Sequence, residues 1–157
     1  MSLSKEILHS EELSTVLSRL QKGIEANGGL LPDQFSEEDL TFLYELGYNL
    51  YQAEDFVQAA DIFQRLTVAR PFEAKHWQGF ASSLFMQKRY EEALVPWSMW
   101  CLIDNTNPIP HFHAAESLFS LGQKEEGLKA LQAAENRDRS GSLKGKIDAL
   151  RTAWGQP

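Results

Sequence analysis

Three tyrosines at helical spacing are the residues of this sequence best suited to contacting another molecule. Tyr44, Tyr48 and Tyr51 follow one another at i, i+4 and i+7, so they share one face of any helix that contains them. A tyrosine offers a large rigid contact surface and a hydroxyl that can hydrogen-bond the backbone of a ligand. The spacing therefore predicts a binding face. The alternative interpretation is that these rings pack beneath an N-terminal helix of the same chain.

Residues that could support catalysis or bind a metal ion are scattered. His111 and His113 are two apart, which places them on different sides of a helix. His76 and His9 have no ligand companions nearby. Cys101 is the only cysteine and lies in an apolar stretch, which favours packing over redox chemistry. No nucleotide-binding, hydrolase or metalloprotease motif occurs, so we expect no enzyme activity, no metal site and no cofactor.

The composition predicts a globular protein and disfavours several kinds of partner. A chain of 157 residues with 43% hydrophobic residues can form a domain with a core of its own. Its net charge of -7 disfavours nucleic acid and anionic membrane surfaces. No stretch approaches the roughly 18 uninterrupted apolar residues of a membrane span, and the first residues contain no apolar signal segment. We expect a cytoplasmic protein without stable membrane insertion.

A repeat of 34 residues organises most of the chain. The segments 40–71, 74–105 and 108–139 align with one another. The aligned positions are Leu46-Gly47 with Phe80-Ala81 and Ala114-Ala115, Ala59 with Ala93 and Gly127, and Phe63 with Trp97 and Leu131. Small residues suit points where two helices cross closely, and bulky ones fill the space between hairpins. This pattern is typical of tetratricopeptide repeats, and it predicts an all-α solenoid of three helix hairpins with N-terminal and C-terminal capping helices.

The expected elements follow from apolar periodicity and from capping residues. Residues 1–29 are expected to form an N-terminal helical region, with a helix over Leu3–Ala26 that Gly28-Gly29 ends. Residues 30–157 contain the repeats and a C-terminal capping helix. Ser36 is a predicted N-cap. The expected helices are Glu37–Gln52, Phe56–Ala69, Phe72–Gln87, Tyr90–Ile103, Ile109–Leu121, Lys124–Asn136 and Leu143–Trp154. Gly127 is expected to weaken the third repeat by about 1 kcal/mol of helix propensity.

The tyrosine face continues through the other repeats at the same 34-residue step. In the tetratricopeptide fold the first helices of successive repeats line a concave groove. The step leads from Tyr44 to Gln78 and Phe112, from Tyr48 to Ser82 and Glu116, and from Tyr51 to Phe85 and Phe119. These nine residues form the predicted peptide-binding groove, in which aromatic rings alternate with polar groups.

Two segments give the sequence a more specific resemblance. Leu43–Tyr51, followed by Phe56-x-x-Ala59-x-x-Ile62-Phe63, resembles the first repeat of the class II chaperones of bacterial type III secretion. Pro108–Leu118 resembles the Pro-rich segment and His-Ala-Ala-Glu helix start of that family, which generic tetratricopeptide repeats do not share. The resemblance covers about residues 30–137. Glu54 departs from it, because family members often have Gly or Lys in this hairpin turn.

The resemblance implies a cytoplasmic chaperone that works without ATP. Such chaperones hold an extended segment of hydrophobic translocator proteins in the concave groove and keep these clients soluble and competent for secretion. Many members form homodimers through the N-terminal helix, and some act with a transcription activator; the resemblance leaves both partners open for this chain. The alternative is a generic tetratricopeptide adaptor between proteins. An adaptor for acidic tails is disfavoured, because the positions where cations would be needed hold Tyr44, Tyr48, Gln78 and Ser82.

Overall fold

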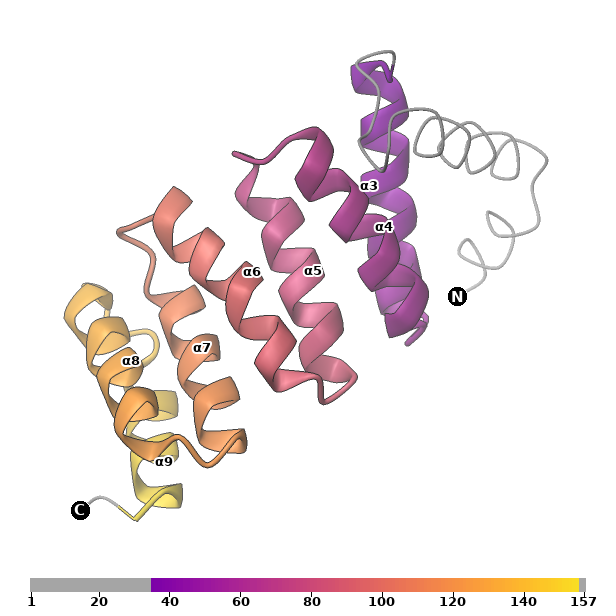
Figure 1. Cartoon of the computed structure of the whole chain (residues 1–157). Coiled ribbons are helices and arrows are strands. Elements are labelled where there is room, and N and C mark those ends of the chain that lie inside the picture. The colour runs from indigo at the N-terminus through magenta and orange to yellow at the C-terminus, as the bar shows by residue number, and fades with distance from the viewer. Residues whose placement is uncertain (1–34, 156–157) are drawn as a thin grey trace. The chain divides into compact units, whose positions relative to one another are not determined.

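The structure is a computed structural model that describes residues 35–155, and every regular element among these residues is an α-helix (Figure 1). The helices are α3 (Glu37–Gln52), α4 (Phe56–Ala69), α5 (Ala74–Met86), α6 (Tyr90–Ile103), α7 (Pro108–Ser120), α8 (Lys124–Arg137) and α9 (Lys144–Ala153). The predicted all-α fold is confirmed. The predicted helix Leu3–Ala26 lies outside the described residues. None of the described helices is both long and apolar enough to cross a membrane.

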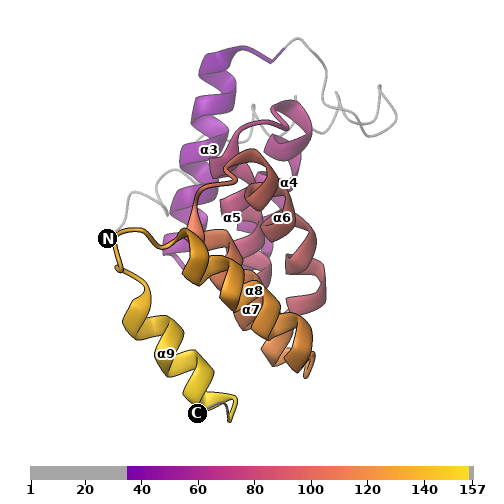
Figure 2. The same cartoon turned by 90° about the vertical axis from the view of Figure 1, so that its left-hand side faces the viewer.

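The chain divides into two compact units, and the boundary between them in the sequence falls within α5. The first unit ends at Ser83 and the second begins at Leu84. In the first unit α3 packs against α4, and in the second unit α7 packs against both α6 and α8. The chain reverses direction after α8, and α9 runs back in contact with α8 (Figure 2).

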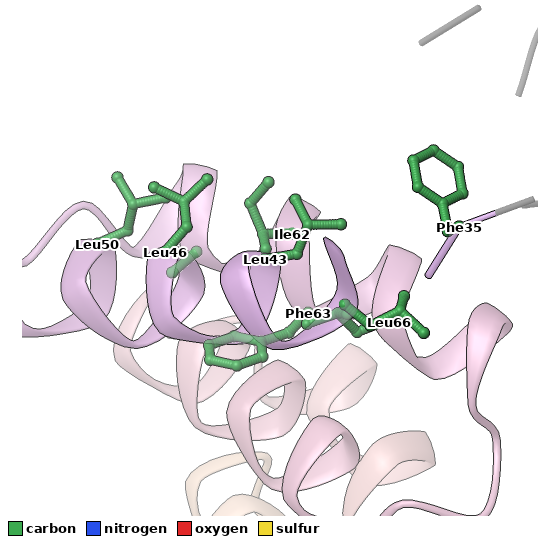
Figure 3. Packing of buried hydrophobic residues seen from close by; sticks show 9 residues of the cluster. Phe35, Leu43, Leu46, Leu50, Ile62, Phe63 and Leu66 are labelled. Carbon is green, nitrogen blue, oxygen red and sulfur yellow. The ribbon is translucent and has the colours of Figure 1, made fainter. Parts of the chain in front are cut away.

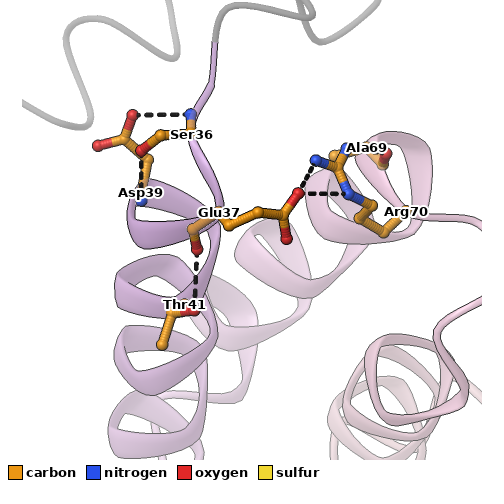
Figure 4. A network of polar contacts seen from close by, with 6 residues as sticks. All are labelled: Ser36, Glu37, Asp39, Thr41, Ala69 and Arg70. Atoms are coloured by element: carbon orange, nitrogen blue, oxygen red, sulfur yellow. Dashed lines mark hydrogen bonds and ion pairs between the residues drawn. The ribbon is translucent and has the colours of Figure 1, made fainter.

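The start of α3 is fixed by its first residues. The Ser36 hydroxyl accepts a hydrogen bond from the Asp39 backbone N–H at 3.1 Å, and the Asp39 carboxylate accepts one from the Ser36 N–H at 3.2 Å (Figure 4). This reciprocal pair is a capping box, so the predicted N-cap at Ser36 is confirmed. Arg70, at the end of α4, donates to the Glu37 carboxylate from Nε at 3.1 Å and ties the two helices together (Figure 4).

The core of the first unit lies between α3 and α4. Leu43, Leu46 and Leu50 form a row along one side of α3 (Figure 3). The other buried apolar members of this core are Phe35, Leu40, Ala59, Ile62, Phe63 and Leu66. These residues form the apolar seam between α3 and α4. Burial of a side chain such as Leu43, which has no exposed surface, contributes about 1.5–3 kcal/mol.

The core of the second unit includes the C-terminal helix. Leu143 and Ile147 of this segment are buried with Phe112, Phe119 and Leu131. The Trp154 ring stacks on the Phe119 ring at a centroid distance of 4.9 Å. Arg151 of α9 pairs with Glu135 of α8 at 2.8 Å. The C-terminal segment thus packs against the end of α7 and against α8.

Gly127 has a packing role that its helix propensity does not reveal. A Cβ atom built on Gly127 would lie 2.6 Å from the Phe119 ring, which is far inside van der Waals contact. That ring has no exposed surface and is held on another side by Trp154. The third repeat therefore needs a glycine at the position where the first two have alanine.

Gly127→Ala is expected to lower the free energy of unfolding by about 1–2 kcal/mol. Alanine gains up to about 1 kcal/mol of helix propensity, but forcing a methyl group against a fixed ring costs about 1–3 kcal/mol. Urea denaturation measures the difference. Gly145→Ala is the matched control, because its new Cβ would have no neighbour within 4 Å, and it should raise stability by about 0.5 kcal/mol. Stabilisation by both substitutions would contradict the packing role of Gly127.

The three hairpin turns share one backbone conformation. Glu54, Lys88 and Gly122 occur at intervals of 34 residues and have φ angles of 62°, 60° and 75°. In the first turn the Asp55 N–H donates to the Leu50 carbonyl at 2.9 Å and the Glu54 N–H donates to the Tyr51 carbonyl at 3.0 Å. These two bonds form a Schellman motif, whose left-handed residue is usually glycine. Glu54 and Lys88 adopt this conformation despite their side chains.

Glu54→Gly is expected to raise the free energy of unfolding by about 0.5–1 kcal/mol. A left-handed L-residue costs about 1–2 kcal/mol, and the added freedom of glycine in the unfolded chain offsets part of that gain. Thermal unfolding followed by circular dichroism measures the change. Gly122→Ala, made at the same position of the third repeat with no neighbouring atom within 4 Å, should lower stability. A Glu54→Gly variant that is less stable than wild type would contradict the prediction, because it would show that the left-handed conformation of Glu54 does not destabilise the first turn.

Candidate functional site

A cavity of about 210 Å³ opens on the first unit between α3 and α5. Its lining residues are Tyr44, Tyr48, Tyr51, Gln52, Phe63, Lys75, Gln78, Gly79 and Ser82. We call it the tyrosine cavity. It brings together five of the nine residues predicted to form a groove, namely Tyr44, Tyr48, Tyr51, Gln78 and Ser82. The helical spacing on α3 and the 34-residue step to α5 thus converge on one concave surface.

The Phe63 ring of α4 sets the shape of this cavity. Cβ atoms built on Gly47 and Gly79 would lie 3.0 and 2.5 Å from the ring, so both glycines leave room for it. The ring also meets the Tyr44 ring edge-on at 5.9 Å. Phe63 is only 3% exposed, and its position therefore connects the core of the hairpin to the wall of the cavity. A larger residue at Gly79 would displace this ring.

The three tyrosines present hydroxyl groups and aromatic faces to the tyrosine cavity. Tyr48 is 52% exposed, whereas Tyr44 and Tyr51 are half-buried. Burial raises the pKa of Tyr44, with a further contribution from neighbouring Tyr48, and burial also raises the pKa of Tyr51. The Tyr44 and Tyr51 hydroxyls therefore remain protonated near neutral pH and can donate hydrogen bonds. The Tyr51 ring is held edge-on by Phe56 at 5.2 Å.

Two further residues of the cavity, Lys75 and Phe63, are not among the nine residues predicted from the sequence. Lys75 holds its ammonium group 4.6 Å from the centre of the Tyr44 ring, within the range of a cation–π interaction. Phe63 contributes surface as well as core packing. The sequence did contain an indication for Lys75. It stands three residues before Gln78, so the two side chains lie on the same side of a helix, and the 34-residue step relates it to Thr41. The prediction followed only the columns that begin at a tyrosine.

The other four predicted groove residues lie in the second unit and differ in exposure. Phe85 is half-buried and meets Tyr90 edge-on at 5.2 Å. The Glu116 carboxylate lies 2.7 Å from His113 Nδ1, within hydrogen-bonding distance. Phe112 and Phe119 are 6% and 0% exposed and belong to the core of that unit. Both of these phenylalanines serve packing here, and Trp154 covers Phe119.

The histidines among the described residues are His76, His111 and His113. Burial lowers the pKa of His76 and of His111, so both rings are neutral at pH 7. His113 stacks on Trp97 at 4.9 Å. Burial raises the pKa of the Cys101 thiol to about 11, which leaves it protonated and a poor nucleophile. Within residues 35–155, no three side chains of metal-binding type gather into a site.

Comparisons of sequence agree with the repeat architecture. The family model described as tetratricopeptide repeat matches residues 40–70 and 75–95. The low calcium response locus protein H of Yersinia pestis is 26% identical over 135 residues, which are 85% of this chain and 78% of that protein. The match extends well beyond the part of the chain that the repeat model covers.

Solved structures show which tetratricopeptide-repeat proteins this chain is similar to. The Yersinia enterocolitica type III secretion chaperone SycD, in complex with a peptide of the translocator YopD, has a TM-score of 0.73 and 25% identity over 78% of this chain and 96% of that one. PcrH, a Pseudomonas aeruginosa protein, in complex with the chaperone binding region of PopB has a TM-score of 0.67 and 30% identity over 77% and 98%. With this identity over nearly all of PcrH, the chain belongs to the class II type III secretion chaperones, the tetratricopeptide-repeat chaperones of translocator proteins.

Proposed function

We propose that this chain binds an extended segment of a hydrophobic translocator protein and keeps that protein soluble until secretion. The observation that carries the proposal is the tyrosine cavity, where three aromatic residues of α3 face polar side chains of α5. Relatives of the same fold are bound to segments of their translocators. An interaction adaptor without a defined client would not account for this combination.

The chemistry of the cavity suits an extended peptide. An aliphatic or proline side chain of the client can enter between the aromatic rings, where its apolar surface leaves water. The tyrosine hydroxyls, Gln78 and Ser82 can hydrogen-bond the backbone of the client on either side of that anchor. An extended segment buries little area per residue, so most of the affinity must come from a few such anchors.

The proposal also covers how the chain acts, where it acts and which further partners it has. The chain acts as a holdase in the bacterial cytoplasm, without ATP and without catalysis. Phe85 and Glu116 of the second unit are partly exposed and remain candidates for contact with the client, whereas Phe112 and Phe119 belong to the core of that unit. A homodimer through the N-terminal helix and an interaction with a transcription activator remain predictions from the family resemblance. The residues for the dimer contact lie outside the described part of the chain.

Co-expression with a translocator from the same bacterium tests the proposal. The translocator alone is expected to be insoluble or toxic, and this chain should hold it in the soluble fraction as a complex that co-purifies. A translocator from which the chaperone-binding segment has been deleted is the control and should not co-purify. If the full-length translocator stays insoluble and unbound in the presence of the chain, the proposed function is wrong.

A further inference from the structure

Lys75 occupies a position between two hollows of the first unit. Its ammonium group lies 4.6 Å from the centre of the Tyr44 ring, at the side of the tyrosine cavity. Lys75 also lines a second cavity of about 160 Å³. The residues around that second cavity are Glu37, Leu40, Thr41, Arg70, Glu73, Lys75 and His76. A peptide that leaves the tyrosine cavity toward the start of α5 would therefore pass Lys75.

The charge of Lys75 is not neutralised by its neighbours in the described part of the chain. Glu37, which also lines the second cavity, is already paired with Arg70 (Figure 4). Glu73 lines the same cavity, but no ion pair between Glu73 and Lys75 forms among the described residues. Lys75 itself is exposed, so it is accessible to a ligand. Among the described residues that line the tyrosine cavity, it is the only cationic side chain.

We propose that Lys75 recognises a carboxylate of the client and thereby sets the register in which the client binds. This inference rests on the proposed function, since it names a further feature of the same ligand. The client would carry an aspartate or glutamate one or two residues from the anchor that enters the tyrosine cavity, because an extended chain advances about 3.3 Å per residue. The contact of Lys75 with Tyr44 restricts where the ammonium group can meet that carboxylate.

The acidity of the whole chain makes such a contact selective. A net charge of -7 disfavours acidic segments at most positions of the surface. Lys75 therefore favours an acidic residue at one position of the client, whereas the net negative charge of the chain disfavours acidic residues at the other positions. The contribution is modest because Lys75 is exposed, and we expect about a three- to fivefold change in affinity that weakens as salt is added.

Position-scanned peptides test the inference. The probes are fluorescein-labelled ten-residue peptides with one proline and one leucine anchor, in which each other position is varied between Glu and Gln. Fluorescence anisotropy gives Kd for the wild-type chain, for Lys75→Met and for Lys146→Met. The Lys146→Met control removes the same charge from an exposed residue of α9. The ratio of the two Kd values at each position cancels any change in Tyr44 packing that Lys75→Met causes.

The expected result is one position at which the Glu peptide binds about three- to fivefold tighter than the Gln peptide. That preference should vanish in Lys75→Met and persist in Lys146→Met. A preference that survives in Lys75→Met, or the lack of any position that favours Glu, overturns the inference. A Tyr48→Ala variant distinguishes a failure of the proposed function from a failure of the role of Lys75. If Tyr48→Ala binds every peptide as tightly as wild type does, the proposed function of the cavity is wrong. If Tyr48→Ala binds the peptides more weakly but Lys75→Met keeps the wild-type ratio of Glu-peptide to Gln-peptide Kd, only the role of Lys75 is refuted.

Discussion

Phe63→Ala is expected to lower the free energy of unfolding by about 3–5 kcal/mol and to abolish client binding at the tyrosine cavity. The ring is 3% exposed and lies against Gly47, Gly79 and Tyr44, so its loss leaves a hole at the point where three helices meet. A domain of this size has a total stability of about 5–15 kcal/mol, and much of it would disappear. Urea denaturation followed by circular dichroism measures the loss.

Phe72→Ala is the matched control for this substitution. Phe72 is 84% exposed in the connection between α4 and α5, so the same change in side chain should alter stability by less than about 0.5 kcal/mol. Phe63→Leu provides a milder test that keeps the protein folded, with an expected loss below about 1.5 kcal/mol. Equal stabilities of Phe63→Ala and Phe72→Ala would refute the central packing role of Phe63.

The double substitution Tyr44→Ala and Tyr48→Ala is expected to weaken binding of the translocator segment about 100-fold. Each ring supplies contact area beside the cavity, and truncation of a central aromatic anchor commonly costs about 1–2 kcal/mol. The two residues are neighbours, so their effects need not add and the single variants should be measured as well. Isothermal titration calorimetry with the purified translocator segment gives the affinities.

Two further variants show whether the loss comes from the cavity. Val57→Ala changes an apolar side chain on α4 that is 67% exposed and lies outside the cavity, so it should bind as wild type does. Tyr48→Phe keeps the ring and removes the hydroxyl, and a loss smaller than that of Tyr48→Ala is expected. If Tyr44→Ala and Tyr48→Ala together leave the affinity unchanged while the chain stays folded, the client binds elsewhere.

Most of the helical framework could be predicted because the repeat specifies it redundantly. The expected bounds of α3, α4 and α6 agree with the structure, since each has a strong apolar pattern and a clear turn before it. The second hairpin was predicted to begin at Phe72, but α5 begins at Ala74. The Glu73 N–H donates to the Arg70 carbonyl at 3.2 Å, which makes Pro71 and Phe72 part of a turn. The apolar character of Phe72 suggested a helix, although its side chain is exposed.

The columns of the repeat predicted which residues are equivalent but not how exposed each one is. The step of 34 residues leads from the tyrosines of α3 to Gln78 and Ser82, which line the same cavity. It also leads to Phe119, which is buried because Trp154 of the C-terminal segment stacks on it. Exposure depends on contacts between elements distant in sequence, and these contacts have no local pattern. For the same reason the need for glycine at position 127 and the place of Lys75 beside Tyr44 became visible only in the folded chain.

Site-specific photo-crosslinking tests most directly whether the tyrosine cavity holds the client. A benzophenone amino acid placed at position 48, where the tyrosine side chain is 52% exposed, should crosslink to the translocator segment in the assembled complex. The same group placed at position 57, on the exposed side of α4, should give no crosslink. Mass spectrometry of the product should locate the attachment next to an apolar anchor of the client. Crosslinking at position 57 and none at position 48 would contradict the account.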